Sequence, residues 1–209
     1  MSRRKTETPL ERAERLRKKA LADYAKKGTG TAWERALERQ HEVWRHEGRA
    51  VIFRAPAPFT TEVILKGGKR QGFLGKVGPP DFLGMGEGYG WALEAKSIKR
   101  LPFSLKNIED HQMDDLAVWG RQATLGLPCV GAILLSVHED GQRWIIFGRD
   151  LLPTWRAWKK SKEGGGRAPA GSGSLSLDDL TRLAIPFEET DWLTPTRRAA
   201  EFFFDPEDL

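Results

Sequence analysis

Apolar residues recur along the chain with two different periods, which together predict the order of its secondary-structure elements. Over residues 31–47, Trp33 and Trp44 share one face at helical spacing, which predicts an amphipathic helix. The same spacing returns over residues 108–122 and predicts a second helix. Short apolar runs bounded by Gly, Pro or Asp predict strands instead, at 50–53, 60–65, 91–96, 129–137 and 143–147.

Turn signals connect these segments. The glycine-rich stretch 81–90 predicts a tight hairpin leading into the strand at 91–96, and residues 65–78 predict a basic hairpin or protrusion. We expect Pro153 to open a short basic helix and Ser176, with Asp179 three positions later, to cap a last one. The order helix, strand, hairpin, strand, helix, strand, strand predicts an α/β domain with a mixed sheet.

Length and composition bound the class of protein. A chain of 209 residues suffices for one domain with tails, and no apolar run approaches the roughly 18 residues that would span a bilayer. We therefore expect no membrane segment, and the N-terminus has no apolar stretch typical of a secretory signal. A single cysteine, Cys129, excludes an intramolecular disulfide and a Cys-based zinc cluster, and favours a reducing, cytoplasmic setting.

Charge is unevenly distributed along the chain. The net charge is +5, but residues 171–209 hold three arginines against nine acids, so residues 1–170 carry +11. This favours an acidic partner such as nucleic acid. By composition we divide the chain into a basic arm at 1–29, a domain at 30–160, a flexible linker at 161–174 and an acidic tail at 175–209.

One group of residues carries candidate chemistry. Glu94 and Lys96 project from the same face of a predicted strand, and Asp81 falls at or near the strand that faces it. Two carboxylates in one small pocket repel each other unless a divalent cation lies between them, and hard oxygen ligands favour Mg²⁺, with Mn²⁺ as its usual substitute. Such a site suits phosphodiester hydrolysis. The alternative is an ordinary cross-strand ion pair on an exposed strand.

Four blocks in a fixed order give the chain a specific resemblance. They are Gly30-Thr31-Ala32-Trp33-Glu34, Ala50-Val51-Ile52 with Pro56-Ala57-Pro58, Asp81 with Leu93-Glu94-Ala95-Lys96, and Pro102-Phe103-Ser104-Leu105-Lys106-Asn107-Ile108 with His111-Gln112. In these blocks residues 30–147 resemble the RecU family of Holliday-junction resolvases, within the PD-(D/E)xK nuclease superfamily. The resemblance implies a restriction-endonuclease-like fold, a mixed sheet flanked by helices.

The resemblance also implies roles for individual residues. It makes Asp81 and Glu94 metal ligands for Mg²⁺ and Lys96 the catalytic lysine, and it directs Gln112 and Glu34 toward the metal as well. The alternatives are a partly exposed helix polar group for Gln112 and a solvated surface acid for Glu34. The basic residues that we expect to contact DNA, in part on the protruding segment near 59–80, are Lys66, Lys69, Arg70, Lys76, Lys99 and Arg100.

The function that the resemblance implies is that of a structure-selective endonuclease, which cuts four-way DNA junctions during recombination or repair. It also implies a homodimer to make paired cuts, and a recombinase as a further partner. Pro79 stands where the family has a ligand threonine, and the segment before Asp81 is short, which indicates a divergent or phage-encoded member. Two alternatives stay open. One is another PD-(D/E)xK nuclease, of the restriction or exonuclease type; the other is a non-catalytic protein that binds DNA or modulates a recombinase.

Overall fold

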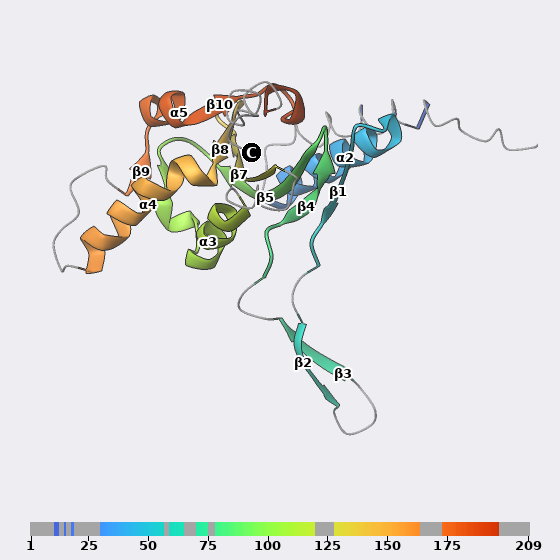
Figure 1. Cartoon of the computed structure of the whole chain (residues 1–209), viewed down its shortest axis with the longest axis horizontal. Coiled ribbons are helices and arrows are strands. Elements are labelled where there is room, and N and C mark those ends of the chain that lie inside the picture. The colour runs from blue at the N-terminus through green and yellow to red at the C-terminus, as the bar shows by residue number, and fades with distance from the viewer. Residues whose placement is uncertain are drawn as a thin grey trace, which may run out of the picture.

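The computed structural model describes residues 30–56, 78–119, 128–163 and 173–196, the backbone of 59–64 and 70–74, and positions 11, 12, 15 and 18. Six strands form its central sheet, in the order β1-β4-β5-β7-β8-β10 (Figure 1). Their bounds are β1 (Ala50–Arg54), β4 (Phe82–Gly86), β5 (Tyr89–Ile98), β7 (Cys129–Val137), β8 (Gln142–Phe147) and β10 (Ala184–Pro186). β5 and β7 run parallel, and the other neighbouring pairs run antiparallel. The predicted mixed sheet is confirmed.

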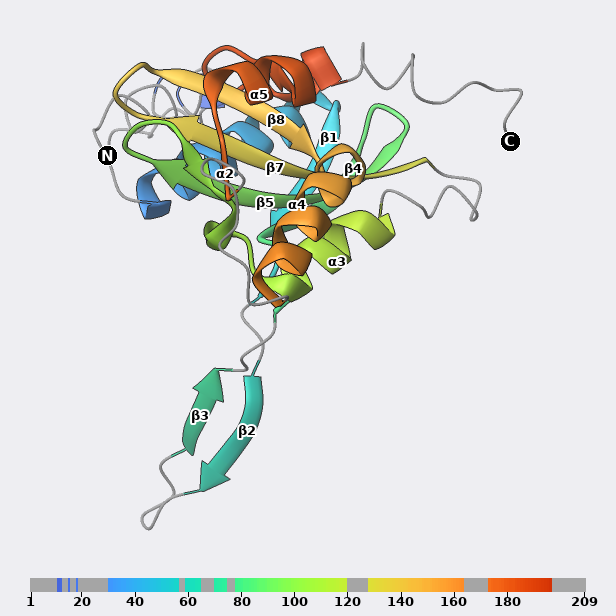
Figure 2. The same ribbon diagram turned by 90° about the vertical axis from the view of Figure 1, so that its left-hand side faces the viewer.

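Helices cover the two faces of the sheet unequally. On one face α2 (Gly30–Glu47) packs on β1 and β5. On the other face α3 (Asp110–Trp119) packs on β5 and β7, while α4 (Gly148–Glu163) packs on β7 and β8 (Figure 2). Each face has its own hydrophobic core, with Trp33 and Trp44 in the first and Leu116 and Leu151 in the second. The α/β class and both predicted helices are confirmed.

A second, two-stranded sheet lies between β1 and β4 in the chain. β2 (Phe59–Ile64) and β3 (Arg70–Leu74) pair antiparallel with each other and are not part of the central sheet. The hairpin expected in this segment is therefore present in the backbone. Of the basic residues assigned to DNA there, Lys66, Lys69 and Lys76 lie outside the described residues, and Arg70 is described by its backbone alone.

The segment from 173 to 196 belongs to the domain, whereas the sequence predicted a separate acidic tail from 175. β9 (Ser174–Leu175) pairs with β6 (Phe103–Ser104), which leads into a short 3-10 helix, η1 (Leu105–Asn107), and α5 (Leu177–Leu183) leads into β10 at the sheet edge. Leu175, Leu180 and Trp192 are fully buried. The prediction was wrong because net charge says nothing of these few apolar side chains, which pack against the two cores.

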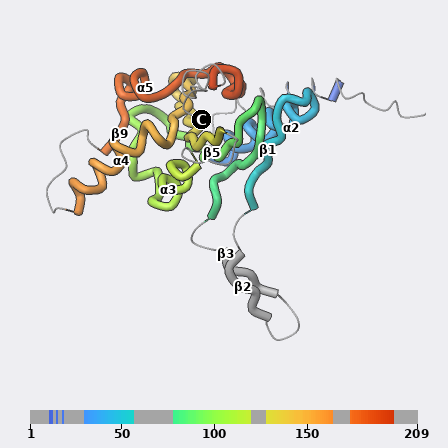
Figure 3. The backbone as a smooth tube through the Cα atoms, in the orientation of Figure 1, coloured from blue at the N-terminus to red at the C-terminus, as the bar shows by residue number. Residues whose placement is uncertain are grey.

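The C-terminal segment also reaches back to the first helix of the fold. Thr190 Oγ1 donates to Gln40 Oε1 at 2.8 Å, and Trp192 Nε1 donates to His41 Nε2 at 3.2 Å. Figure 3 traces this path, with the chain running from α5 back toward α2. Residues 173–196 thus tie the far edge of the sheet to its first layer, while 164–172 and 197–209 lie outside the described residues.

Local signals at the helix starts had different outcomes. Ser176 and Asp179 form the expected capping box, each side chain accepting from the other's backbone N–H. Pro153 does not open α4, which begins at Gly148 and includes the proline. A proline so near a helix start removes at most one intrahelical hydrogen bond, so the helix continues through it. No helix in the described part of the chain is both long and apolar enough to cross a membrane.

Candidate active site

Asp81 and Glu94 lie side by side on adjacent strands. The tight turn at Glu87 and Gly88, both with positive φ, folds β5 back on β4 so that Phe82 pairs with Leu93. The residues just outside that pair are therefore opposed. The backbone confirms this, since Ala95 N–H donates to Asp81 Oδ2 at 2.9 Å and Asp81 N–H donates to Glu94 Oε2 at 3.4 Å. The facing-strand prediction is correct.

Gln112 reaches the same place from helix α3. The helix can lie close to the sheet because β7 has a glycine at the crossing, where a Cβ on Gly131 would be 2.1 Å from the Leu116 carbonyl oxygen. Gln112 is two residues into the helix, and its side chain points to the strand that carries Glu94. The close packing of α3 is therefore what completes the group.

Hydrogen bonds join Glu94, Lys96 and Gln112 in a closed set. Lys96 Nζ donates to Glu94 Oε1 at 2.9 Å and to Gln112 Oε1 at 3.0 Å, and Gln112 Nε2 also donates to Glu94 Oε1. Glu109 N–H donates to the same Gln112 oxygen at 3.1 Å. The amide thus bridges the lysine and the carboxylate and fixes their relative position.

Burial gives the site its electrostatic character. Glu94 is only 3% exposed, and burial raises the pKa of its carboxyl to about 7, against the lowering effect of Lys96 and with a further rise from Asp81. A buried carboxylate beside a second, half-buried one favours a bound cation, because burial limits screening by water. A carboxyl whose pKa is raised in this way favours a functional site.

Glu34 lies at the edge of this group. Burial raises the pKa of its carboxyl, Arg54 lowers it, and Asp81 raises it, so the two acids lie within electrostatic range of each other. Arg54 pairs with both Glu34 and Glu38, the latter at 3.2 Å. The sequence did not single out Arg54. A usable signal for it was present: a basic residue ends a strand, and two acids lie four residues apart on the helix before that strand.

The donor set fits a hard divalent cation. Asp81 and Glu94 offer carboxylate oxygens on one face, and Mg²⁺ needs only one or two carboxylates because it keeps several waters. Among the described residues no group of three or more His, Cys, Asp or Glu side chains converges as a metal site. Pro79 offers no side-chain oxygen, and the Gln112 oxygen faces Lys96.

Lys99 and Arg100 follow β5 and are exposed. Lys99 Nζ lies 3.6 Å from Glu139 Oε1, and its side chain is largely in solvent. They lie just beyond Lys96, after the end of its strand.

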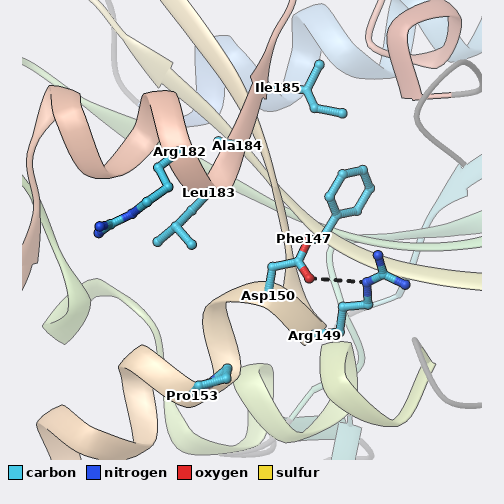
Figure 4. Close-up of a pocket in the computed structure, with 8 residues that line it drawn as sticks. All are labelled: Phe147, Arg149, Asp150, Pro153, Arg182, Leu183, Ala184 and Ile185. Atoms are coloured by element: carbon cyan, nitrogen blue, oxygen red, sulfur yellow. Dashed lines mark hydrogen bonds and ion pairs between the residues drawn. The ribbon is translucent and has the colours of Figure 1, made fainter. Parts of the chain in front are cut away.

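A separate hollow of about 420 Å³ lies between α4, α5 and β10 (Figure 4). Phe147, Ile185 and Arg182 are among the residues that line it, and Arg149 pairs with Asp150 at 3.2 Å. It contains none of the residues predicted for catalysis.

A family model described as RecU, Recombination protein U, matches residues 28–165. The matched region is more than half of the chain and includes Glu34, Asp81, Glu94, Lys96 and Gln112. None of the curated proteins compared with the chain matches it.

Proposed function

The chain belongs to the RecU family of recombination proteins, whose role is that of Holliday-junction resolvases, and on that premise we propose that it cuts four-way DNA junctions by metal-dependent hydrolysis of phosphodiester bonds. The observation that carries the proposal is the convergence of Asp81, Glu94, Lys96 and Gln112 from two strands and one helix. These are the residues that the resemblance to the family assigns to the nuclease site.

Each residue has a distinct part in the proposed reaction. Asp81 and Glu94 hold Mg²⁺, or Mn²⁺ in its place, and the bound ion supplies Lewis-acid activation of the phosphate and a lowered pKa for the attacking water. Lys96, held 2.9 Å from Glu94, offers a fixed positive charge to the negative charge that develops on the phosphate. Gln112 orients that lysine. Glu34 contributes a further acid at the margin, directly or through water.

The DNA contacts form the second part of the proposal. Lys66, Lys69, Arg70 and Lys76 belong to the segment around the β2–β3 hairpin, and we assign them to the junction together with Lys99 and Arg100. A four-way junction has near two-fold symmetry and needs two cuts, so we propose a homodimer with one site in each subunit. We further propose a cytoplasmic setting and a recombinase as the protein partner.

The decisive experiment compares cleavage of synthetic four-way junctions, linear duplex and single-stranded DNA in Mg²⁺ and in Mn²⁺. We expect paired nicks in the junction by the wild type and none by Asp81→Asn. Equal cleavage of linear duplex would instead indicate the restriction or exonuclease type of activity. No cleavage of any substrate by the wild type in either metal would refute the enzyme.

A non-catalytic role in DNA binding is the second candidate, and Pro79 is the observation that favours it. Calorimetric titration with Mn²⁺ separates the two. Binding that disappears in Glu94→Gln supports the catalytic proposal, whereas no binding by the wild type favours the binding protein.

A further inference from the structure

The hollow of about 420 Å³ between α4, α5 and β10 combines apolar and basic side chains. Its apolar members come from three elements, with Phe147 at the end of β8, Pro153 on α4 and Ile185 on β10. Figure 4 shows Phe147 between Ile185 and the Arg149–Asp150 ion pair. β10 is an end strand of the central sheet, so no further strand of that sheet covers the hollow.

The hollow has an excess of positive charge. Two arginines line it, Arg149 and Arg182, against the single carboxylate of Asp150. The side chain of Arg182 is 73% exposed, and its bond to Asp179 engages Nη2. A guanidinium carries five N–H donors, so Arg182 has donors for a second carboxylate as well. Apolar surface beside arginines suits a ligand that is both apolar and acidic.

The chain itself contains a segment of that kind. Residues 202–204 are three consecutive phenylalanines, and Glu201 and Asp205 flank them. Over residues 201–208 there are four acids and no basic residue. Three adjacent aromatic side chains gain free energy when they leave water for an apolar surface. The flanking carboxylates match the arginines of the hollow in charge.

The last described residues lie close enough for this segment to reach the hollow. Trp192 belongs with Phe147 to the first core, and its ring centroid lies 5.1 Å from that of Trp91 on β5. β7 lies between β5 and β8, so these two strands are about 10 Å apart. Thr196 N–H donates to the Trp192 carbonyl, one helical turn before it. Phe202 comes six residues after Thr196, and an extended chain covers about 3.3 Å per residue, or about 20 Å in all.

We propose that residues 201–205 of the same chain dock into this hollow, with the phenylalanines against Phe147 and Ile185. The flanking carboxylates then pair with Arg149 and Arg182. Because a few residues tether the segment, its effective concentration at the hollow is of the order of millimolar, and modest contacts suffice. Docking is independent of the proposed nuclease activity, since the hollow contains none of the residues assigned to catalysis.

Photo-crosslinking in the whole chain tests the docking directly. p-Benzoylphenylalanine replaces Phe203, and mass spectrometry of tryptic peptides locates the bonds that ultraviolet light forms. We expect crosslinks within one chain to residues 147–153 and 183–185. In a second measurement, serines replace all three phenylalanines of residues 202–204. Hydrogen exchange over residues 183–185 should then be at least threefold faster than in the wild type, because the covering segment is lost.

Variants of the hollow show which contacts hold the segment. Arg182→Glu and Ile185→Asp should each lower the crosslink yield at least fivefold. Leu177→Glu is the matched control, because Leu177 is exposed on α5 but does not line the hollow. Arg182 is an exposed side chain, so its replacement leaves both cores intact, and far-ultraviolet circular dichroism shows whether Ile185→Asp is folded.

The outcomes separate docking within one chain from other uses of the segment. Crosslinks that join two chains, at twice the 23.6 kDa of one chain, would assign the segment to a second copy and overturn the inference. Crosslinks only to other parts of the chain, or none at all, also overturn it, as do equal yields in Arg182→Glu and the wild type. Crosslinks at the hollow that are lost in Arg182→Glu and kept in Leu177→Glu support it, whether or not the wild type cleaves DNA.

Discussion

Lys96 Nζ donates to Gln112 Oε1 at 3.0 Å, so a lysine on strand β5 is held by an amide from helix α3. The same amide donates through Nε2 to Glu94, and its oxygen is held by Glu109 N–H. The amide therefore cannot rotate without breaking contacts with both catalytic candidates. Gln112 is best understood as the residue that positions Lys96 against Glu94.

Replacing Gln112 with Met tests that positioning role. Methionine fills a similar volume but offers no amide, so we expect kcat for junction cleavage to fall by about 10–100-fold, with junction affinity little changed. Asp114→Asn, an exposed change on the same helix, is the control. Single-turnover cleavage and gel-shift assays measure the two quantities, and a loss of affinity with unchanged kcat would contradict the positioning role.

Replacing Lys96 with Met removes the fixed charge beside Glu94. We expect the cleavage rate to fall by at least about 100-fold, because a charge aimed at the developing phosphate charge is lost. Junction binding should persist, since the basic residues that we assign to DNA contact are unchanged in this variant. Lys106→Met removes the same charge from an exposed position of η1 and should cleave as the wild type does. Comparable losses in both variants would show that only overall charge matters.

The pairing of the two carboxylates could be predicted from local sequence. Glu87-Gly88 marks a tight turn, and strand alternation then fixes which residues share a face, so Asp81 and Glu94 follow by counting. Gln112 could not be found in this way. Its position depends on how closely α3 approaches β7, which the glycine at position 131 decides, and only the family resemblance pointed to it before the structure.

The C-terminal segment shows why charge composition gave a wrong prediction, whereas counting along the strands paired Asp81 and Glu94 correctly. Residues 173–196 hold five acids and one arginine, so charge dominated the prediction. Leu175, Leu180 and Trp192 have no common period, and their partners lie far away in sequence: Leu175 and Leu180 belong to the second core and Trp192 to the first. Burial that depends on such distant contacts leaves no local pattern to read.

His41 predicts a dependence of stability on pH. Burial lowers the pKa of its imidazole to about 3 from an ordinary 6.5, and its Nε2 accepts from Trp192 Nε1, which protonation would prevent. A lowered folded-state pKa means that this contribution to stability is intact above pH 6.5 and is lost as the pH falls below it. At pH 5 the loss is about 2 kcal/mol.

Urea denaturation at pH 7.5 and pH 5 measures this effect. We expect His41→Met to show a smaller fall in the free energy of unfolding between the two pH values than the wild type. Comparing the two falls in the free energy of unfolding removes any constant cost of the substitution itself. His138→Gln, at a partly buried histidine at the end of β7, is the control. An equal fall in the free energy of unfolding for wild type and His41→Met would assign the pH dependence to other groups.

Trp192 predicts that the C-terminal segment stabilises the whole domain. Its indole is fully buried, and its ring centroid lies 5.2 Å from that of Trp44 and 5.1 Å from that of Trp91, so it joins α2 to β5. We expect Trp192→Ala to lower the free energy of unfolding by about 3–5 kcal/mol, because the cavity lies in the first core. Leu177→Ala, in an exposed position of the same segment, should change it by less than about 0.5 kcal/mol. Thermal and urea unfolding of both variants measure this, and a negligible effect of Trp192→Ala would return residues 173–196 to the status of a dispensable tail.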